Sequence, residues 1–217
     1  MHPLAFGAVE QSQCLPSSTA QVARSLKYAT ALDYRAATVP EGNSVARAPD
    51  PRLTLGVGLV EFPDYLRRLP VVTRVAPNRV ELSEEKRWAE PLDKNFTRVL
   101  SENLATMLGT QRIEKYPWPL ATKIDYQIEV DVQRFETTSD GQAQLVASWI
   151  IRDGRSEKIQ YASKTTAAAP AGADATSASS ALSSDLATLS KAIAENVIEL
   201  DQHPSAAKSE SDRAESA

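Results

Sequence analysis

The sequence is poor in the residues that most often carry chemistry or cross-links. It has one cysteine, Cys14, and two histidines, His2 and His203, among 217 residues. A single thiol forms no internal disulfide and no thiolate metal site. Both histidines fall in segments near the chain ends, where no rigid shell would hold an imidazole against a nucleophile or a metal. The sequence therefore predicts no catalytic residue, no metal site and no cofactor.

Motifs that mark common active sites are also missing. The chain contains no G-x-S-x-G, no G-x-x-x-x-G-K-[ST], no H-E-x-x-H and no C-x-x-C, which removes several large enzyme classes. Asp125, Glu129 and Asp131 alternate along one stretch, and such carboxylates are able to pair for acid–base chemistry or bind a hard cation. We favour a solvated strand face, because a period of two explains all of them. An enzyme is not expected.

Charge and hydropathy exclude two further classes of protein. The 24 basic and 28 acidic residues give a net charge of -4, and no cationic stripe suits a nucleic acid backbone. No segment approaches the roughly 20 consecutive apolar residues that cross a bilayer. The length suits one full core and not two. We expect a flexible arm over 1–24, one domain over 25–200 and a disordered tail over 201–217.

Two helices are predicted from apolar residues that recur every three or four positions. The first starts at Pro91, which fits the first helical position, and ends at Gly109, which fits a C-cap. The second covers 182–200, with leucine, isoleucine and valine on one face. The stretch before it, 165–180, is rich in small residues and poor in large apolar ones. A loop is expected there.

Strands are predicted where apolar and polar residues alternate. The clearest covers 124–133, and a second covers 142–151. Between the second and a third antiparallel strand at 156–164, the pair Asp153-Gly154 favours a two-residue hairpin. Further candidates are 25–34, 53–62 and 78–90.

The strand predicted at 53–62 has one apolar face and one glycine face. Leu53, Leu55, Val57 and Leu59 share the first, and we expect a helix to cover Gly56 and Gly58 on the second. The aromatic residues Tyr116, Trp118, Trp149 and Tyr161 are expected in the core rather than in a ligand groove. Together these patterns predict an α/β fold, with a mixed, mostly antiparallel sheet and two helices packed on one face.

The stretch Arg87-Trp88-Ala89-Glu90-Pro91-Leu92 places charges, an aromatic ring and a proline where a strand gives way to a helix. As a structural corner, Trp88 packs at the junction, Glu90 lies near the positive helix end beside Arg87, and Pro91 starts the helix. As a partner contact, Arg87 and Trp88 are exposed together, because both residue types are common in binding hot spots. The sequence leaves both interpretations open.

Three stretches resemble the ABC-type transport auxiliary lipoprotein family, the PqiC-type proteins. They are "GVGLVEFPDYL" at Gly56 to Leu66, "RWAEPL" at Arg87 to Leu92 and "YPW" at Tyr116 to Trp118, followed by the strand "IDYQIEVDVQRFE". Their order and spacing make the resemblance specific, and it runs from about Leu53 to about Leu200.

The resemblance implies a periplasmic lipoprotein tethered to the outer membrane that works with an MCE-type protein in lipid transport and membrane integrity. It brings no catalytic residue, and it implies a small α/β domain. Family members carry an acylated cysteine after a lipobox, and Cys14 is the candidate here, although "VEQSQ" before it lacks the expected leucine. One acyl chain anchors a protein only reversibly, so we expect a homo-oligomer that adds avidity.

A second function remains open at this point. The domain is alternatively a periplasmic carrier that binds a lipid or another apolar ligand in a cavity between its helices and its sheet. Stoichiometric phospholipid in the purified protein would indicate a carrier.

Overall fold

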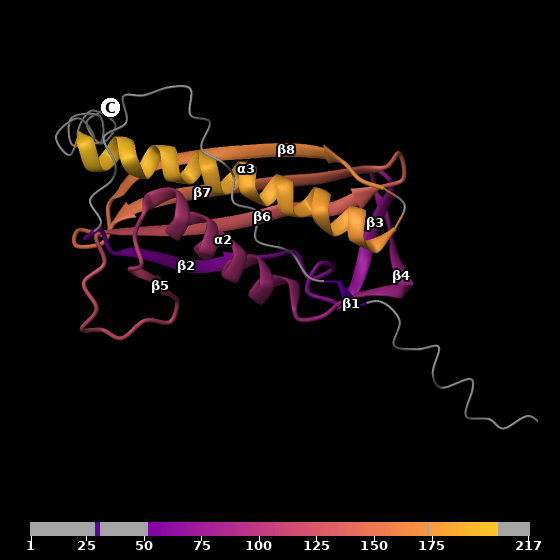
Figure 1. The fold of residues 1–217 in the computed structure, drawn as a ribbon, viewed down its shortest axis with the longest axis horizontal. Helices are drawn as coiled ribbons and strands as arrows, with labels where there is room; N and C mark the ends of the chain where they lie inside the picture. The colour runs from indigo at the N-terminus through magenta and orange to yellow at the C-terminus, as the bar shows by residue number, and fades with distance from the viewer. Residues whose placement is uncertain (1–28, 31–51, 173, 204–217) are drawn as a thin grey trace, which may run out of the picture.

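The computed structural model describes residues 29–30, 52–172 and 174–203 (Figure 1). Cys14, most of the strand predicted at 25–34 and the tail from 204 onward lie outside the described residues. The helices and strands below are those of the described part of the chain.

The described elements comprise one mixed sheet and two helices. The strands are β1 (Ala29–Thr30), β2 (Leu55–Glu61), β3 (Pro70–Ala76), β4 (Arg79–Trp88), β5 (Ile113–Lys115), β6 (Tyr126–Thr138), β7 (Gln142–Asp153) and β8 (Ile159–Pro170). The helices are α2 (Leu92–Leu108) and α3 (Ala175–Gln202). The strand order is β1-β4-β3-β6-β2-β5, with β7 pairing with β6 and β8 pairing with β7.

Strand β6 lies at the centre of the sheet. Strands β6, β7 and β8 form a long antiparallel meander, while β2 and β3 both pair parallel with β6. Figure 1 shows α2 and α3 side by side on one face of this sheet. The predicted α/β fold, with a mixed sheet and two helices packed on one face, is confirmed.

Helix α2 forms as the apolar period predicts. Gly109 adopts the left-handed conformation at φ 62°, and its N–H bonds to the carbonyl oxygens of Ala105 and Thr106. A glycine reaches this conformation without steric cost, which is why the helix ends there. Pro91 is the N-cap rather than the first helical residue, so the helix begins one position later than predicted.

The core fills the layer between the helices and the sheet. The ring of Phe96 on α2 is fully buried and packs edge to face against Phe62 and Phe135, with ring centroids 5.2 Å away in both cases. Between the helices, the side-chain amide of Asn103 donates to the Ser190 hydroxyl at 3.1 Å. These contacts hold α2 against both α3 and the central strand.

Strand β2 departs from the predicted alternation. Leu55 and Val57 are fully buried as expected, but Leu59 is 57% exposed and Val60 is buried instead. The pairing with β6 shifts register between Val57 and Val60. Such a bulge moves the following side chains to the other face of the strand, so the prediction that Leu59 joins the buried face is wrong.

The glycine face of β2 is covered, but not by the predicted helix. A Cβ atom on Gly56 would lie 3.1 Å from side-chain atoms of both Trp118 and Ile124. A Cβ atom on Gly58 would lie 2.9 Å from the carbonyl oxygen of Ile128 on β6. Gly56 therefore admits an aromatic ring from the segment after β5, and a helix was the wrong expectation.

The hairpin between β7 and β8 is antiparallel as predicted, but its turn is longer than two residues. Arg152 pairs with Ile159, and the Asp153 carboxylate accepts hydrogen bonds from the N–H groups of Arg155 and Ser156. A Cβ atom on Gly154 would lie 2.1 Å from the carbonyl oxygen of Ile124. The Asp153 carboxylate thus stabilises a turn of more than two residues, and Gly154 lets the backbone at Ile124 approach closely.

The loop predicted over 165–180 is wrong. Strand β8 continues to Pro170, which pairs with Gln142 at the start of β7. Helix α3 then begins at Ala175, because Asp174 caps it by accepting a hydrogen bond from the N–H of Ser177 at 2.9 Å. Composition indicated a loop here, whereas pairing along β7 and an N-cap determine the structure.

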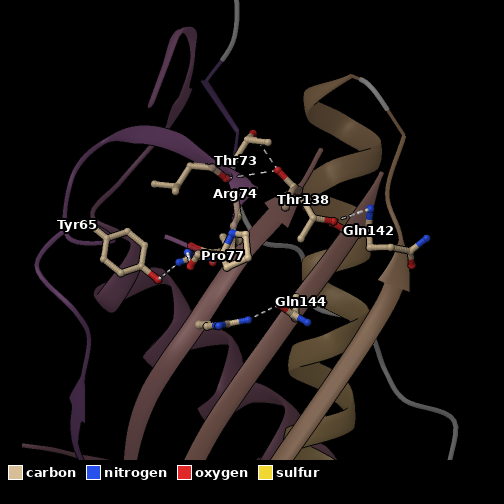
Figure 2. A network of polar contacts seen from close by, with 11 residues as sticks. Tyr65, Thr73, Arg74, Pro77, Thr138, Gln142 and Gln144 are labelled. Atoms are coloured by element: carbon tan, nitrogen blue, oxygen red, sulfur yellow. Dashed lines mark hydrogen bonds and ion pairs between the residues drawn. The ribbon is translucent and has the colours of Figure 1, made fainter. Parts of the chain in front are cut away.

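A polar network fixes the β3–β4 hairpin to β6, and Figure 2 shows it from close by. The two strands β3 and β6 pair only at Thr73–Thr137 and Arg74–Thr138. The Arg74 guanidinium forms an ion pair with the fully buried Glu136 side chain and donates to the carbonyl oxygen of Pro77. The hydrogen bond to Glu136 raises the pKa of Arg74, so the guanidinium stays charged. This ion pair adds to the two residue pairs that join β3 to β6.

We predict that Arg74→Met lowers the free energy of unfolding by about 3–5 kcal/mol, because it leaves a buried carboxylate without its cation. Urea denaturation measures the change. Arg79→Met is the control on the same hairpin, because the Arg79–Glu81 pair is 69% and 54% exposed and should contribute about 0–1 kcal/mol. Equal effects of the two substitutions would contradict this role of Arg74.

Candidate functional site

The strand-to-helix corner joins the end of β4 to the start of α2. Trp88 is 6% exposed and Leu92 is 1% exposed, so both side chains belong to the core. The N–H of Trp88 donates to the carbonyl oxygen of Leu69 at 2.8 Å, which closes the corner against the segment before β3. Trp88 therefore faces the core and is not an exposed anchor.

The other residues of the corner are either exposed to solvent or bonded within the domain. Arg87 and Pro91 are exposed. Glu90 accepts a hydrogen bond from the Asn95 side chain at 2.7 Å, and its ion-pair partner is Arg98 at 3.4 Å rather than Arg87. The Glu90 carboxylate thus ties the corner to the first turns of α2, and Arg87 is the residue of this stretch that reaches solvent as a cation.

The corner also receives strand β1, which lies within the strand predicted at 25–34, but the sequence patterns did not reveal that it pairs here. Ala29 and Thr30 pair parallel with Arg87 and Trp88. Long-range pairing of two residues leaves no local signal in a sequence. Strand β1, the first described element of the chain, therefore joins the domain at this corner.

The three alternating carboxylates do not form an acid–base pair. Asp125 accepts a hydrogen bond from the N–H of Thr54 at 2.9 Å. Glu129 forms an ion pair with Arg152 at 2.8 Å, and Asp131 is exposed. In the described residues, no group of three or more histidine, cysteine, aspartate or glutamate side chains is placed to hold a metal ion. Asp131 fits the expected solvated strand face, whereas Asp125 precedes β6 and, like Glu129, is half-buried and bonded within the domain.

The aromatic residues divide between core and surface. Trp149 is 3% exposed, and its indole N–H donates to the Thr165 hydroxyl at 2.9 Å. Tyr116 is 60% exposed and packs edge to face on the half-buried ring of Trp118. The expectation of a core position is correct for Trp149 and wrong for Tyr116 and for Tyr161, which is 36% exposed.

A groove lies beside the corner, between the first turns of α2 and the second half of β2. It has a volume of about 310 Å³. The residues that line it are Gly58, Leu59, Val60, Asp93, Lys94, Thr97, Arg98, Lys115 and Tyr116. No sequence pattern predicts this groove, since the bulge in β2 that exposes Leu59 has no periodic signal.

Asp185 on α3 is a buried acid without a matching base. It is 2% exposed, and its Oδ2 atom has no hydrogen-bond partner. Burial raises the pKa of this carboxyl to about 6. An unfolded chain would titrate an aspartate near 3.9, so the folded protein loses stability as pH rises from about 4 through about 6.

We predict that Trp88→Ala lowers the free energy of unfolding by about 3–5 kcal/mol, as large-to-small changes in a core do. Arg87→Ala should change it by about 0.5 kcal/mol or less, because the side chain is exposed. Chemical denaturation followed by circular dichroism compares the neighbours directly. A large loss with Arg87→Ala would mean that its side chain, and not only its backbone, supports the corner.

We predict that Asp185→Asn stabilises the protein at pH 7.5 by about 1–2 kcal/mol, because the neutral amide avoids the cost of a buried charge. The gain should shrink toward zero as pH falls to about 3, below the unfolded pKa near 3.9, where Asp185 is protonated in both states. Thermal unfolding from about pH 3 to about pH 8 measures the difference in stability between the two proteins. Asp140→Asn at an exposed turn is the control and should show no such pH dependence.

Comparison with known proteins identifies relatives of this fold. Among solved structures, the protein XCC0632 from Xanthomonas campestris superposes with a TM-score of 0.69 at 15% identity, over 82% of this chain and 99% of that one. An uncharacterized protein superposes with a TM-score of 0.59 at 22% identity, over 67% of this chain and 92% of that one. Both likenesses concern the fold alone. Among curated proteins, none is a significant match.

The sequence itself matches a family model over most of its length. The matched residues, 36–194, run from before β2 to the last turns of α3. They include the corner, the groove and the central meander. The chain belongs to the family of ABC-type transport auxiliary lipoprotein components.

Proposed function

We propose that this chain is a non-enzymatic accessory lipoprotein subunit of an MCE-type envelope lipid transport system, acting in the periplasm and anchored to the outer membrane through Cys14. The observation that carries the proposal is the family match over residues 36–194. Its role is assembly, with itself and with an MCE-type partner, and through assembly it supports membrane integrity.

The chemistry of the described residues supports a role without catalysis. Two of the three alternating acids are engaged within the domain, Asp125 by the N–H of Thr54 and Glu129 by Arg152, while Asp131 is exposed on the strand face. Asp185 has a raised pKa, but it lies within α3 with a side chain that is 2% exposed. A general acid has to reach its substrate, and this one is covered.

Packing between the helices and the sheet argues against the carrier alternative. A carrier needs an internal cavity that takes an acyl chain. The layer is filled instead by side chains that are at most 1% exposed, including Phe96, Phe135, Leu104, Leu145 and Leu186. Surface contacts therefore suit this domain better than an enclosed ligand.

Anchoring places a physical demand on the assembly. In the described residues, neither helix combines the length and the apolar character that a bilayer crossing requires. Acyl chains on Cys14 would supply the membrane affinity, and one chain alone binds only reversibly. Several chains on one cysteine or several subunits in one assembly would make the attachment durable.

The mass of the mature protein from cells tests the anchor. We predict that Cys14 is its N-terminal residue and carries acyl chains, and that Cys14→Ser moves the protein from the membrane fraction to the soluble one. Ser12→Ala is the matched control, since it changes a neighbouring residue and leaves the thiol. A mature chain with an unmodified Cys14 would contradict the anchor.

Copurification tests the assembly independently of the anchor. The full chain carrying Cys14→Ser should still bind the MCE-type protein of the same envelope in detergent-free buffer. A strictly monomeric sample without such binding would contradict the accessory role, even if acylation of Cys14 were found.

A further inference from the structure

The outer edge of β2 is only half covered by its neighbour. Strand β5 pairs with Leu55, Gly56 and Val57, and the last bond of this ladder runs from the N–H of Tyr116 to the carbonyl oxygen of Val57. On the inner edge, Val60 and Glu61 continue to pair with β6. Within the described residues, no strand pairs with the outer edge of Gly58–Glu61.

The bulge in β2 marks the point where this free edge starts. Register with β6 shifts between Val57 and Val60, and Leu59 is 57% exposed there. Bulges bend a strand and re-aim its side chains, and they are common beside binding sites. A free strand edge that carries an exposed leucine is a template for a further strand.

Helix α2 forms the opposite wall of a groove along this edge. Asp93, Lys94, Thr97 and Arg98 face it from the first turns of the helix, and Lys115 and Tyr116 close the end next to β5. Figure 1 shows α2 running past the second half of β2, while β5 lies beside the first half. A volume of about 310 Å³ suits a few residues of extended chain rather than a folded domain.

The charges along the groove indicate what kind of chain fits. Lys94 and Lys115 are exposed and form no ion pair with any described residue. Arg98 divides its contacts between Glu90 and Glu102, and Asp93 is the acid among the lining residues. The balance favours acidic side chains in the occupant, while the exposed Leu59 and Tyr116 offer an apolar contact.

We propose that the groove between β2 and α2 binds an extended acidic peptide segment of another protein, which adds as a strand to the edge of Gly58–Glu61. Backbone hydrogen bonds to the edge supply affinity, and alternate side chains meet Lys94, Lys115 and Leu59. The edge is about 13 Å long at 3.3 Å per residue, so it accommodates about four residues. The proposal concerns the described domain and does not depend on acylation or on lipid transport.

A defined probe tests this site in the full chain. The probe is a fluorescein-labelled hexapeptide of alternating glutamate and valine, and fluorescence anisotropy reports its binding. Lys94→Glu combined with Lys115→Glu should weaken binding about tenfold or more, a change of about 1.4 kcal/mol. Lys164→Glu on the exposed face of β8 is the matched control and should leave binding unchanged.

Two altered probes separate strand addition from simple charge attraction. Methylation of alternate amide nitrogens, made in both registers, keeps the charges and removes the N–H groups that a strand edge needs. At least one methylated register should lose binding about tenfold. A lysine–valine probe should bind more weakly than the glutamate probe. Equal binding of both methylated registers and the parent peptide would overturn the proposal.

Hydrogen exchange locates the bound peptide. The probe should protect the amides of 58–61 and leave those of β8 (159–170) unchanged, since β8 is a further edge strand that pairs with β7 alone among the described strands. Protection of 159–170 alone would overturn the proposal. Protection of 58–61 that increases with protein concentration in the absence of peptide would also overturn it, because a second copy of this chain would then be the occupant.

Discussion

Strand β6 holds the architecture together, because three other strands depend on it for hydrogen bonds. Along one edge β7 pairs with nearly its whole length, and the other edge is shared by β2 at the start and β3 at the end. Its apolar face packs under both helices through residues such as Val132 and Phe135. Because β3 meets β6 at only two residue pairs, the rest of the β3–β4 hairpin lies beyond this ladder. The outer edge of β2 is free in its second half for a different reason, since β5 pairs only with Leu55, Gly56 and Val57.

Local periodicity predicted the elements that need nothing from the rest of the chain. Helix α2 has a full apolar stripe and a glycine just after its C-terminus. Along β6 and β7, apolar and polar residues alternate over most of each strand. Such patterns specify both the type of an element and its buried face. The corner residues Trp88 and Leu92 are therefore in the core, as the structural interpretation of that stretch required.

Features that depend on distant partners were beyond the sequence patterns. Strand β8 runs through an alanine-rich stretch because β7 offers it a continuous ladder. A strand was expected around β1, but its pairing with Arg87 and Trp88 was not. The bulge at Leu59 has the same origin, since register is set between strands and not within one. The groove could not be predicted from the sequence for the same reason, because the bulge in β2, the end of β5 and the first turns of α2 form it together.

The three stretches that carry the family resemblance converge in space around the first turns of α2. Gly58 and Tyr116 line the groove, and the corner from Arg87 to Leu92 starts the helix that forms its other wall. Trp118 lies over Gly56, so a larger residue at Gly56 would displace the aromatic segment that ends the groove. A buried corner alone would account for Trp88 and Leu92, but not for an exposed Tyr116 beside an exposed Leu59. The proposed contact surface next to the corner accounts for both sets, because the buried residues position the helix and the exposed ones are available to a partner.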